Sequence, residues 1–226
     1  MKDYDVEKSL ISIHLPKCGG SSLTSVLKDW FGDFYREHYY RPGVMPEKLK
    51  LSPGLCIHGH FVPERKVSVK DYYPEASQFI TFVRDPLKSV ESLYYFNLKR
   101  SKIRKEKGLD NNYDRFMTKF PDVDHFVSNA KFWMLDQLPF EVNKENYKKV
   151  ISEFVYIGVV EEYERSLAGL SDALGKKMPE LVPHKNKGEI RKPTSHLVAQ
   201  EFRERHQLEY MFYSEVLALL KNADKR

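Results

Sequence analysis

Residues 14–22, with the sequence H-L-P-K-C-G-G-S-S, have the composition of a phosphate-binding turn. Two glycines in this segment let the backbone approach an oxyanion closely and adopt φ angles that a Cβ would forbid. Ser21 and Ser22 supply hydroxyl donors, and Lys17 supplies a positive charge on a flexible stem. The chemistry that this set favours is stabilisation of phosphate charge, including charge on a bridging oxygen that leaves during group transfer.

The flanking residues predict the order strand, tight loop, helix. The apolar run Leu10–Ile13 precedes the loop and is typical of a short buried strand. The first N–H groups of a helix have no intrahelical partner, and the macrodipole is positive there, so an anion is favoured. Ser21 is a candidate for the helix cap. Helical spacing begins directly after the loop, with Leu23, Val26, Leu27 and Trp30.

The position of the lysine separates this loop from the nucleoside triphosphate P-loop. That motif reads G-x-x-x-x-G-K-[ST], with the lysine after the glycines and a magnesium-binding hydroxyl behind it. Here Lys17 comes first. This order argues against a magnesium-dependent kinase, and it leaves an ordinary strand–helix turn as the alternative to a phosphate site.

A second anion site is predicted where another apolar strand, residues 78–83, ends in Arg84-Asp85-Pro86. Asp85 is suited to cap the following helix, and Pro86 is suited to its first turn. Arg84 would project from the carboxyl end of the strand, where open α/β sheets bind ligands. An arginine fork with a serine hydroxyl makes a phosphate site. Two serines lie three residues apart on this helix, Ser89 and Ser92.

The pattern along the chain predicts one α/β domain, residues 1–226, with a central parallel sheet flanked by helices. Two further strands are expected at residues 55–61 and 154–160. We expect an irregular connection at 33–53, a solvated helix end and loop at 99–114, a helix at 116–138, and a helix stopped by Gly175. A basic segment, 184–192, is a ligand contact or merely solvated surface, and a last helix is expected to start at Thr194 or Ser195.

The composition is that of a soluble globular protein of 226 residues, with 41% hydrophobic and 31% charged residues. The net charge of +5 suits an anionic ligand, but no basic-aromatic ladder predicts nucleic-acid binding. No apolar run is long enough to span a bilayer, and the amino end is unlike a signal peptide. With two cysteines the simplest expectation is a reduced, cytoplasmic setting, although a chain trimmed of a Golgi anchor would look similar. Nothing indicates an oligomeric state.

The two predicted anion sites together resemble those of sulfotransferases that use 3′-phosphoadenosine 5′-phosphosulfate (PAPS), whose first loop reads P-K-[TC]-G-[GS]-[ST]-[ST]. The resemblance implies a P-loop-containing sulfotransferase fold. It also implies that a second turn, through Arg84 and Ser92, holds the 3′-phosphate. The first loop would hold the 5′-phosphosulfate through Lys17, Cys18, Gly19, Gly20, Ser21 and Ser22.

Within that family, H-G-H-F at residues 58–61 and Y-I-G-V-V-E-E at 156–162 resemble the carbohydrate group, which contains the uronyl 2-O-sulfotransferases and small bacterial relatives. The second histidine of H-x-H is taken as the base in that group, which implies His60 here, with His58 orienting it or binding the acceptor. Lys88 stands where relatives often carry arginine. The short sequence shows no stem or membrane anchor, so the resemblance does not extend to a Golgi location or a glycosaminoglycan acceptor.

An imidazole with a pKa near neutrality is suited to remove a proton from an acceptor hydroxyl. The alternative is that His58 or His60 is a hydrogen-bonded structural histidine. A metal site is disfavoured because two histidines need further ligands, and no nearby spacing offers them. His14 is expected to pack or hydrogen-bond locally.

These features predict transfer of a sulfuryl group from PAPS to a hydroxyl of a carbohydrate or small metabolite, releasing PAP without a metal. The alternatives are a nucleotide-binding module that lost the chemistry and, third, a small-molecule kinase. The acceptor itself is not predicted, because loops of variable sequence make those contacts.

Overall fold

The computed structural model of the chain describes residues 1–40, 44–110, 112–131, 134–181 and 192–223. Apart from Lys192, the basic segment 184–192 lies outside the described residues, so neither interpretation of it is tested. None of the described helices is both long and apolar enough to cross a bilayer.

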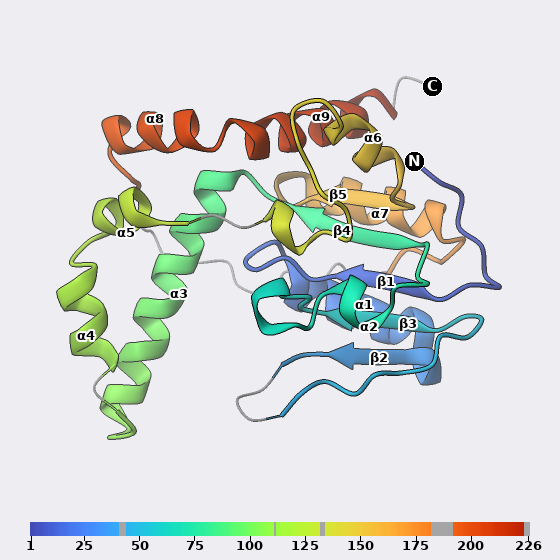
Figure 1. The fold of residues 1–226 in the computed structure, drawn as a ribbon, viewed down its shortest axis with the longest axis horizontal. Coiled ribbons are helices and arrows are strands. Elements are labelled where there is room, and N and C mark those ends of the chain that lie inside the picture. The colour runs from blue at the N-terminus through green and yellow to red at the C-terminus, as the bar shows by residue number, and fades with distance from the viewer. Residues whose placement is uncertain (41–43, 111, 132–133, 182–191, 224–226) are drawn as a thin grey trace.

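Five parallel strands form one sheet in the order β2-β3-β1-β4-β5 (Figure 1). Strand β1 lies in the middle, with Ile13 opposite Gly59 of β3 and Thr81 of β4. Because parallel strands end at the same edge of a sheet, the turns that follow β1, β3 and β4 come together there. The strands are β1 Leu10–Ile13, β2 Tyr35–His38, β3 Cys56–Gly59, β4 Phe79–Val83 and β5 Tyr156–Val159.

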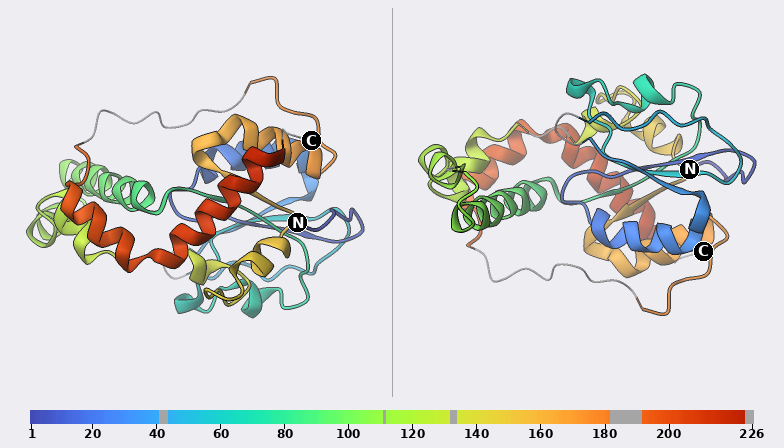
Figure 2. Two further views of the ribbon diagram at one scale, coloured as in Figure 1. Left: turned by 90° about the horizontal axis from the view of Figure 1, so that it is seen from above. Right: turned by 90° about the horizontal axis from the view of Figure 1, so that it is seen from below.

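Helices cover both faces of this sheet, which explains why every residue of β1, β3, β4 and β5 is buried. One face packs against α1 and α7 and the other against α2 and α6, while α9 runs across the β5 edge of the sheet and packs on α6 (Figure 2). Cys56 faces the first layer and Ile57 the second, as the alternation of a strand requires. The bounds are α1 Gly20–Phe31, α2 Val69–Tyr72, α6 Tyr147–Ser152, α7 Tyr163–Ala173 and α9 Gln207–Ala223.

A third apolar cluster lies beyond the carboxyl ends of the strands, where α3 leaves the sheet (Figure 1). Tyr94 of α3, Phe126 of α5 and Phe202 of α8 are buried in it. The helices of this lobe are α3 Pro86–Glu106, α4 Asn112–Lys119, α5 Val123–Asn129 and α8 His196–Arg205. Short 3-10 helices complete the chain at η1 Gly32–Phe34, η2 Pro63–Arg65, η3 Leu135–Gln137 and η4 Val160–Glu162.

The four predicted strands are confirmed, and so is the stop at Gly175, which has a positive φ of 61° just beyond α7. Three predictions of where helices and loops begin and end are wrong. The segment 33–53 contains strand β2, and the helix expected at 116–138 is divided between α4, α5 and η3. The predicted last helix is interrupted at His206 and forms two helices, α8 and α9. Ser195 is the N-cap residue of α8, but its side chain makes no capping hydrogen bond.

The segment 99–114 is more helical than expected. Helix α3 continues to Glu106, and α4 already includes Asp114. An ion pair between Lys105 and Asp114, 2.6 Å apart, joins the two helices at their exposed surface. The sequence alone shows the charges of this segment but not that they pair across a helical hairpin.

Candidate functional site

The loop between β1 and α1 leaves the start of a helix open. Gly19 is the N-cap residue of α1, with a φ of 76°, and no side chain caps this end. The prediction that Ser21 caps the helix is therefore wrong, and its side chain is exposed. The N–H groups of Gly20 and Ser21 open the helix without intrahelical acceptors. This end of α1 keeps both the donors and the dipole that an anion needs.

Gly20 is required at this position by a neighbouring ring and not by its backbone angles. A Cβ built on Gly20 would lie 1.7 Å from Nε2 of His14. Only glycine allows the imidazole to pack directly against the first turn of α1. Gly19 is required for a different reason, because its positive φ is disfavoured for residues with a side chain.

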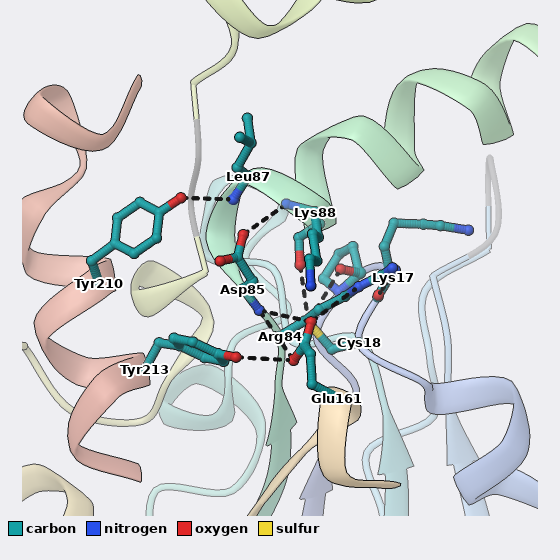
Figure 3. Close-up of polar contacts among 11 residues, drawn as sticks. Lys17, Cys18, Arg84, Asp85, Leu87, Lys88, Glu161, Tyr210 and Tyr213 are labelled. Atoms are coloured by element: carbon teal, nitrogen blue, oxygen red, sulfur yellow. Dashed lines mark hydrogen bonds and ion pairs between the residues drawn. The ribbon is translucent and has the colours of Figure 1, made fainter. Parts of the chain in front are cut away.

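Lys17 adopts a left-handed backbone conformation with a φ of 64°, which is uncommon for a residue other than glycine. Its ammonium lies 4.2 Å from the centroid of the Phe96 ring on α3. Figure 3 shows the Lys17 side chain directed away from Glu161. The backbone carbonyl of Lys17 accepts a hydrogen bond from Nη1 of Arg84 at 3.2 Å.

Cys18 packs under the loop. Its thiol is buried, and Sγ lies 3.7 Å from Oγ of Ser89 on α3. Burial raises the pKa of Cys18 to about 12, so the thiol is protonated at neutral pH. The side chain of Cys18 therefore holds the loop against α3. Its backbone N–H donates to the carbonyl of Leu15 at 3.2 Å, so this donor is already used within the loop.

The helix start after β4 is built differently from that of α1. Asp85 caps α3 as predicted, accepting the N–H of Lys88 at 3.0 Å. The hydroxyl of Tyr210 accepts the N–H of Leu87 at 3.3 Å. Because these N–H groups are satisfied within the protein, an anion at this turn must be held by side chains.

Arg84 connects the two turns. Nη1 of Arg84 donates to the carbonyl of Lys17, and Nε lies 3.8 Å from a carboxylate oxygen of Glu161 (Figure 3). The two anion sites predicted from the sequence thus meet at the edge where β1 and β4 end. The predicted partner of Arg84, Ser92, is buried on α3.

His58 is fully buried, and both of its ring nitrogens are engaged. Nδ1 lies 2.9 Å from Oγ of Ser12, and Nε2 lies 3.1 Å from Oγ1 of Thr24. The Thr24 hydroxyl already donates to the carbonyl of Gly20, so it accepts from Nε2, and Ser12 donates to Nδ1. Burial lowers the pKa of His58 to about 3. This arrangement fits the alternative of a hydrogen-bonded structural histidine, because both ring nitrogens have partners within the protein.

His60 follows β3 and is held differently. Its Nδ1 lies 2.6 Å from the carbonyl oxygen of His14. A carbonyl can only accept, so in the neutral ring the proton is on Nδ1 and the lone pair is on Nε2. Burial is the main cause that lowers the pKa of His60, and the His14 carbonyl opposes it. A neutral imidazole with a free lone pair is what a general base requires.

His14 belongs to the same cluster, although the sequence indicated only local packing. Its ring stacks on those of His58 and His60, with centroids 5.2 and 4.3 Å away. The hydroxyl of Tyr39 lies 2.9 Å from Nδ1 of His14. Burial, the largest cause, lowers the pKa of His14 to about 2, so the cluster is uncharged at neutral pH.

Three residues of the site were not singled out from the sequence: Glu161, Tyr213 and Tyr39. A glutamate directly after a predicted parallel strand was a signal for Glu161, because that position faces the ligand edge. Tyr213 comes from the last helix, and no local pattern indicates that it reaches this edge. Within the described part of the chain, no group of three or more His, Cys, Asp or Glu side chains could hold a metal ion.

Two surface hollows are lined mainly by other residues, although Tyr210, which bonds the start of α3, lines the first of them. One, of about 660 Å³, lies along α9 beside Arg203 and Met211. The other, of about 310 Å³, lies near the amino ends of the strands and includes Trp30 and Phe34. Neither is lined by the loop 14–22, by Arg84 or by the histidine cluster.

The site therefore consists of the start of α1, which no side chain caps, an arginine that donates to the loop before α1, and a histidine whose Nε2 has no hydrogen-bond partner among the described residues. No model of a known protein family matches the chain, and a search of curated proteins finds no match to it.

Proposed function

We propose that this chain is a sulfotransferase that moves a sulfuryl group from PAPS to an acceptor hydroxyl. The observation that carries the proposal is the hydrogen bond from Arg84 to the carbonyl of Lys17. It joins the two turns whose sequences resemble the 5′-phosphosulfate and 3′-phosphate sites of that family. One nucleotide with phosphates at both ends could contact both turns.

The residues of this chain fit the proposed donor. The N–H groups at the uncapped start of α1 and the Lys17 ammonium would stabilise negative charge on the 5′-phosphate. The flexible stem of Lys17 allows its ammonium to leave Phe96 for a bound phosphate. Arg84 and Ser92 would hold the 3′-phosphate. PAPS supplies the sulfuryl group when bound, and PAP is the leaving group.

His60 is the proposed base. Its Nε2 lone pair would take the proton of the acceptor hydroxyl as that oxygen attacks sulfur. The bond from Nδ1 to the His14 carbonyl fixes the ring and its tautomer. His14 also packs on Gly20, so the proposed base and the proposed phosphate loop share one neighbour. Positioning the acceptor and donor is then most of what the protein must do.

The test is transfer of label from ³⁵S-PAPS to hydroxyl acceptors, using carbohydrate and metabolite fractions of cell extracts and mass spectrometry to find a gain of one sulfuryl group. We expect transfer by the wild-type chain and none by Lys17→Ala. Binding of PAP without transfer to any fraction would favour a nucleotide-binding module without chemistry. Magnesium-dependent binding of ATP in place of PAP would favour a kinase.

A further inference from the structure

The carboxylate of Glu161 lies where three segments of the chain meet. It follows β5, and its oxygens lie 3.4 Å from the N–H of Asp85 and 3.3 Å from the hydroxyl of Tyr213 on α9. Burial is the main cause that raises the pKa of Tyr213, which keeps its hydroxyl protonated as a donor. Tyr213 therefore holds the Glu161 side chain from α9, and Asp85 holds it from the turn that carries Arg84 (Figure 3).

Arg84 lies between this carboxylate and the first loop. Nε of Arg84 is 3.8 Å from a carboxylate oxygen of Glu161, and Nη1 donates to the Lys17 carbonyl at 3.2 Å. Nε is buried and has no hydrogen-bond partner among the described residues, so the Glu161 carboxylate is what compensates it. Ordering a long side chain costs conformational entropy. Because these two contacts already order the Arg84 side chain, ligand binding does not have to meet that cost.

We propose that Glu161, held by Tyr213, is a positioning residue that orients the Arg84 guanidinium for the 3′-phosphate of the nucleotide. This inference rests on the proposed function. Among the described residues, the contacts of Arg84 at Nε and Nη1 leave the N–H groups of Nη2 for a ligand oxyanion. Two roles of Glu161 predict opposite results, because a carboxylate that does not orient Arg84 would only repel a nearby phosphate. Removal of Glu161 weakens phosphate binding if it orients Arg84, and strengthens it if it only adds negative charge.

The experiment compares the affinities of PAP and AMP, which differ by the 3′-phosphate, by calorimetry. The ratio of the two affinities reports the 3′-phosphate contact. We expect Glu161→Ala to lower this ratio about tenfold, the size of a charge-assisted hydrogen bond, with the AMP affinity unchanged. Glu162→Ala is the matched control, because Glu162 is the next residue and pairs with Arg165 at 3.9 Å. It should leave the ratio as in the wild-type chain.

A double-mutant cycle separates an effect through Arg84 from a general loss of structure. Arg84→Ala should lower the ratio, and adding Glu161→Ala to it should lower it no further. If Glu161→Ala does not fold, Tyr213→Phe replaces it, since this variant removes only the hydroxyl that holds Glu161, and about a threefold fall is expected. An unchanged or increased ratio in these variants overturns the role of Glu161. Equal binding of PAP and AMP by the wild-type chain overturns the proposed function itself.

Discussion

His60 donates its Nδ1 proton to the carbonyl oxygen of His14, 2.6 Å away. His14 is the first residue after β1, and His60 is the first after β3, so this bond links the ends of two adjacent strands. The ring of His14 in turn packs on Gly20, the first residue of α1. The proposed base is thus attached to the proposed phosphate loop through one residue.

Replacing His60 tests its assignment as the base. We expect His60→Ala to lower the rate of sulfuryl transfer at least about a hundredfold, because general base catalysis contributes that much or more. The affinity for PAP should stay within about twofold, since the variant leaves the loop and Arg84 in place. His125→Ala, which changes an exposed histidine on α5, is the control. A wild-type rate in His60→Ala would end the assignment.

The pH dependence of the rate gives an independent test. The pKa of His60 is lowered from its usual 6.5, chiefly by burial, and the base must be neutral. The rate should therefore be constant from neutral pH upward and fall only below pH 6.5. A pH profile of kcat/KM measures this in the free enzyme. An acidic limb with its midpoint above pH 6.5 is inconsistent with this environment.

Gly20→Ala should disturb the loop although its backbone angles suit alanine. The new methyl group would meet the His14 ring at 1.7 Å, and overpacking of this kind costs about 1–3 kcal/mol in free energy of unfolding. In a His14→Ala background the same change should cost nothing, because alanine is favoured over glycine in a helix by up to about 1 kcal/mol. Denaturant unfolding of the four proteins measures the difference. Equal costs in both backgrounds would contradict the contact.

The buried His38 side chain should make the folded chain less stable in acid. It is fully buried and stacks on Phe61 at 4.4 Å, and neither ring nitrogen has a hydrogen-bond partner among the described residues. Burial lowers its pKa to about 4, which the nearby Val67 backbone partly opposes. Below pH 6.5 the unfolded chain binds a proton that the folded chain does not, so the free energy of unfolding falls as pH decreases from 6.5 toward 4.

The variant His38→Phe removes the imidazole that takes up this proton in the unfolded chain, and it keeps an aromatic ring to stack on Phe61. Its free energy of unfolding should depend less on pH, by about 1.4 kcal/mol per pH unit over this window. Urea unfolding at several pH values between 4 and 7 gives both slopes. Identical slopes for the variant and the wild-type chain would show that His38 is protonated equally in the folded and unfolded states.

The elements with strong local signals were predictable. Strand β4, with every residue apolar or threonine, and the Asp85 cap with Pro86 behind it were identified from residue types alone. Strand β2 was missed because its burial pattern does not alternate: Tyr35 and His38 are buried, and Arg36 and Glu37 are exposed. It is a strand because β3 offers it an edge, which is a tertiary effect.

The residues of the candidate site were likewise predictable only in part. The loop 14–22 and Arg84 were found because their chemistry is local, in glycines, a lysine and a strand end. The role of His58 could not be read from its spacing to His60, because its burial depends on Ser12 and Thr24 from other elements. The break at His206 contains neither glycine nor proline, so nothing in the pattern predicted that α9 turns to bring Tyr213 to Glu161.

The central claim is that the turn after β1 and the turn after β4 together bind one nucleotide with phosphates at both ends. Calorimetric titration of the wild-type chain with PAP, in the absence of divalent cations, tests it most directly. We expect one PAP per chain, bound at least about tenfold more tightly than AMP, and losses of about tenfold or more in both Lys17→Ala and Arg84→Ala. No binding of PAP, or binding that neither substitution weakens, would contradict the account.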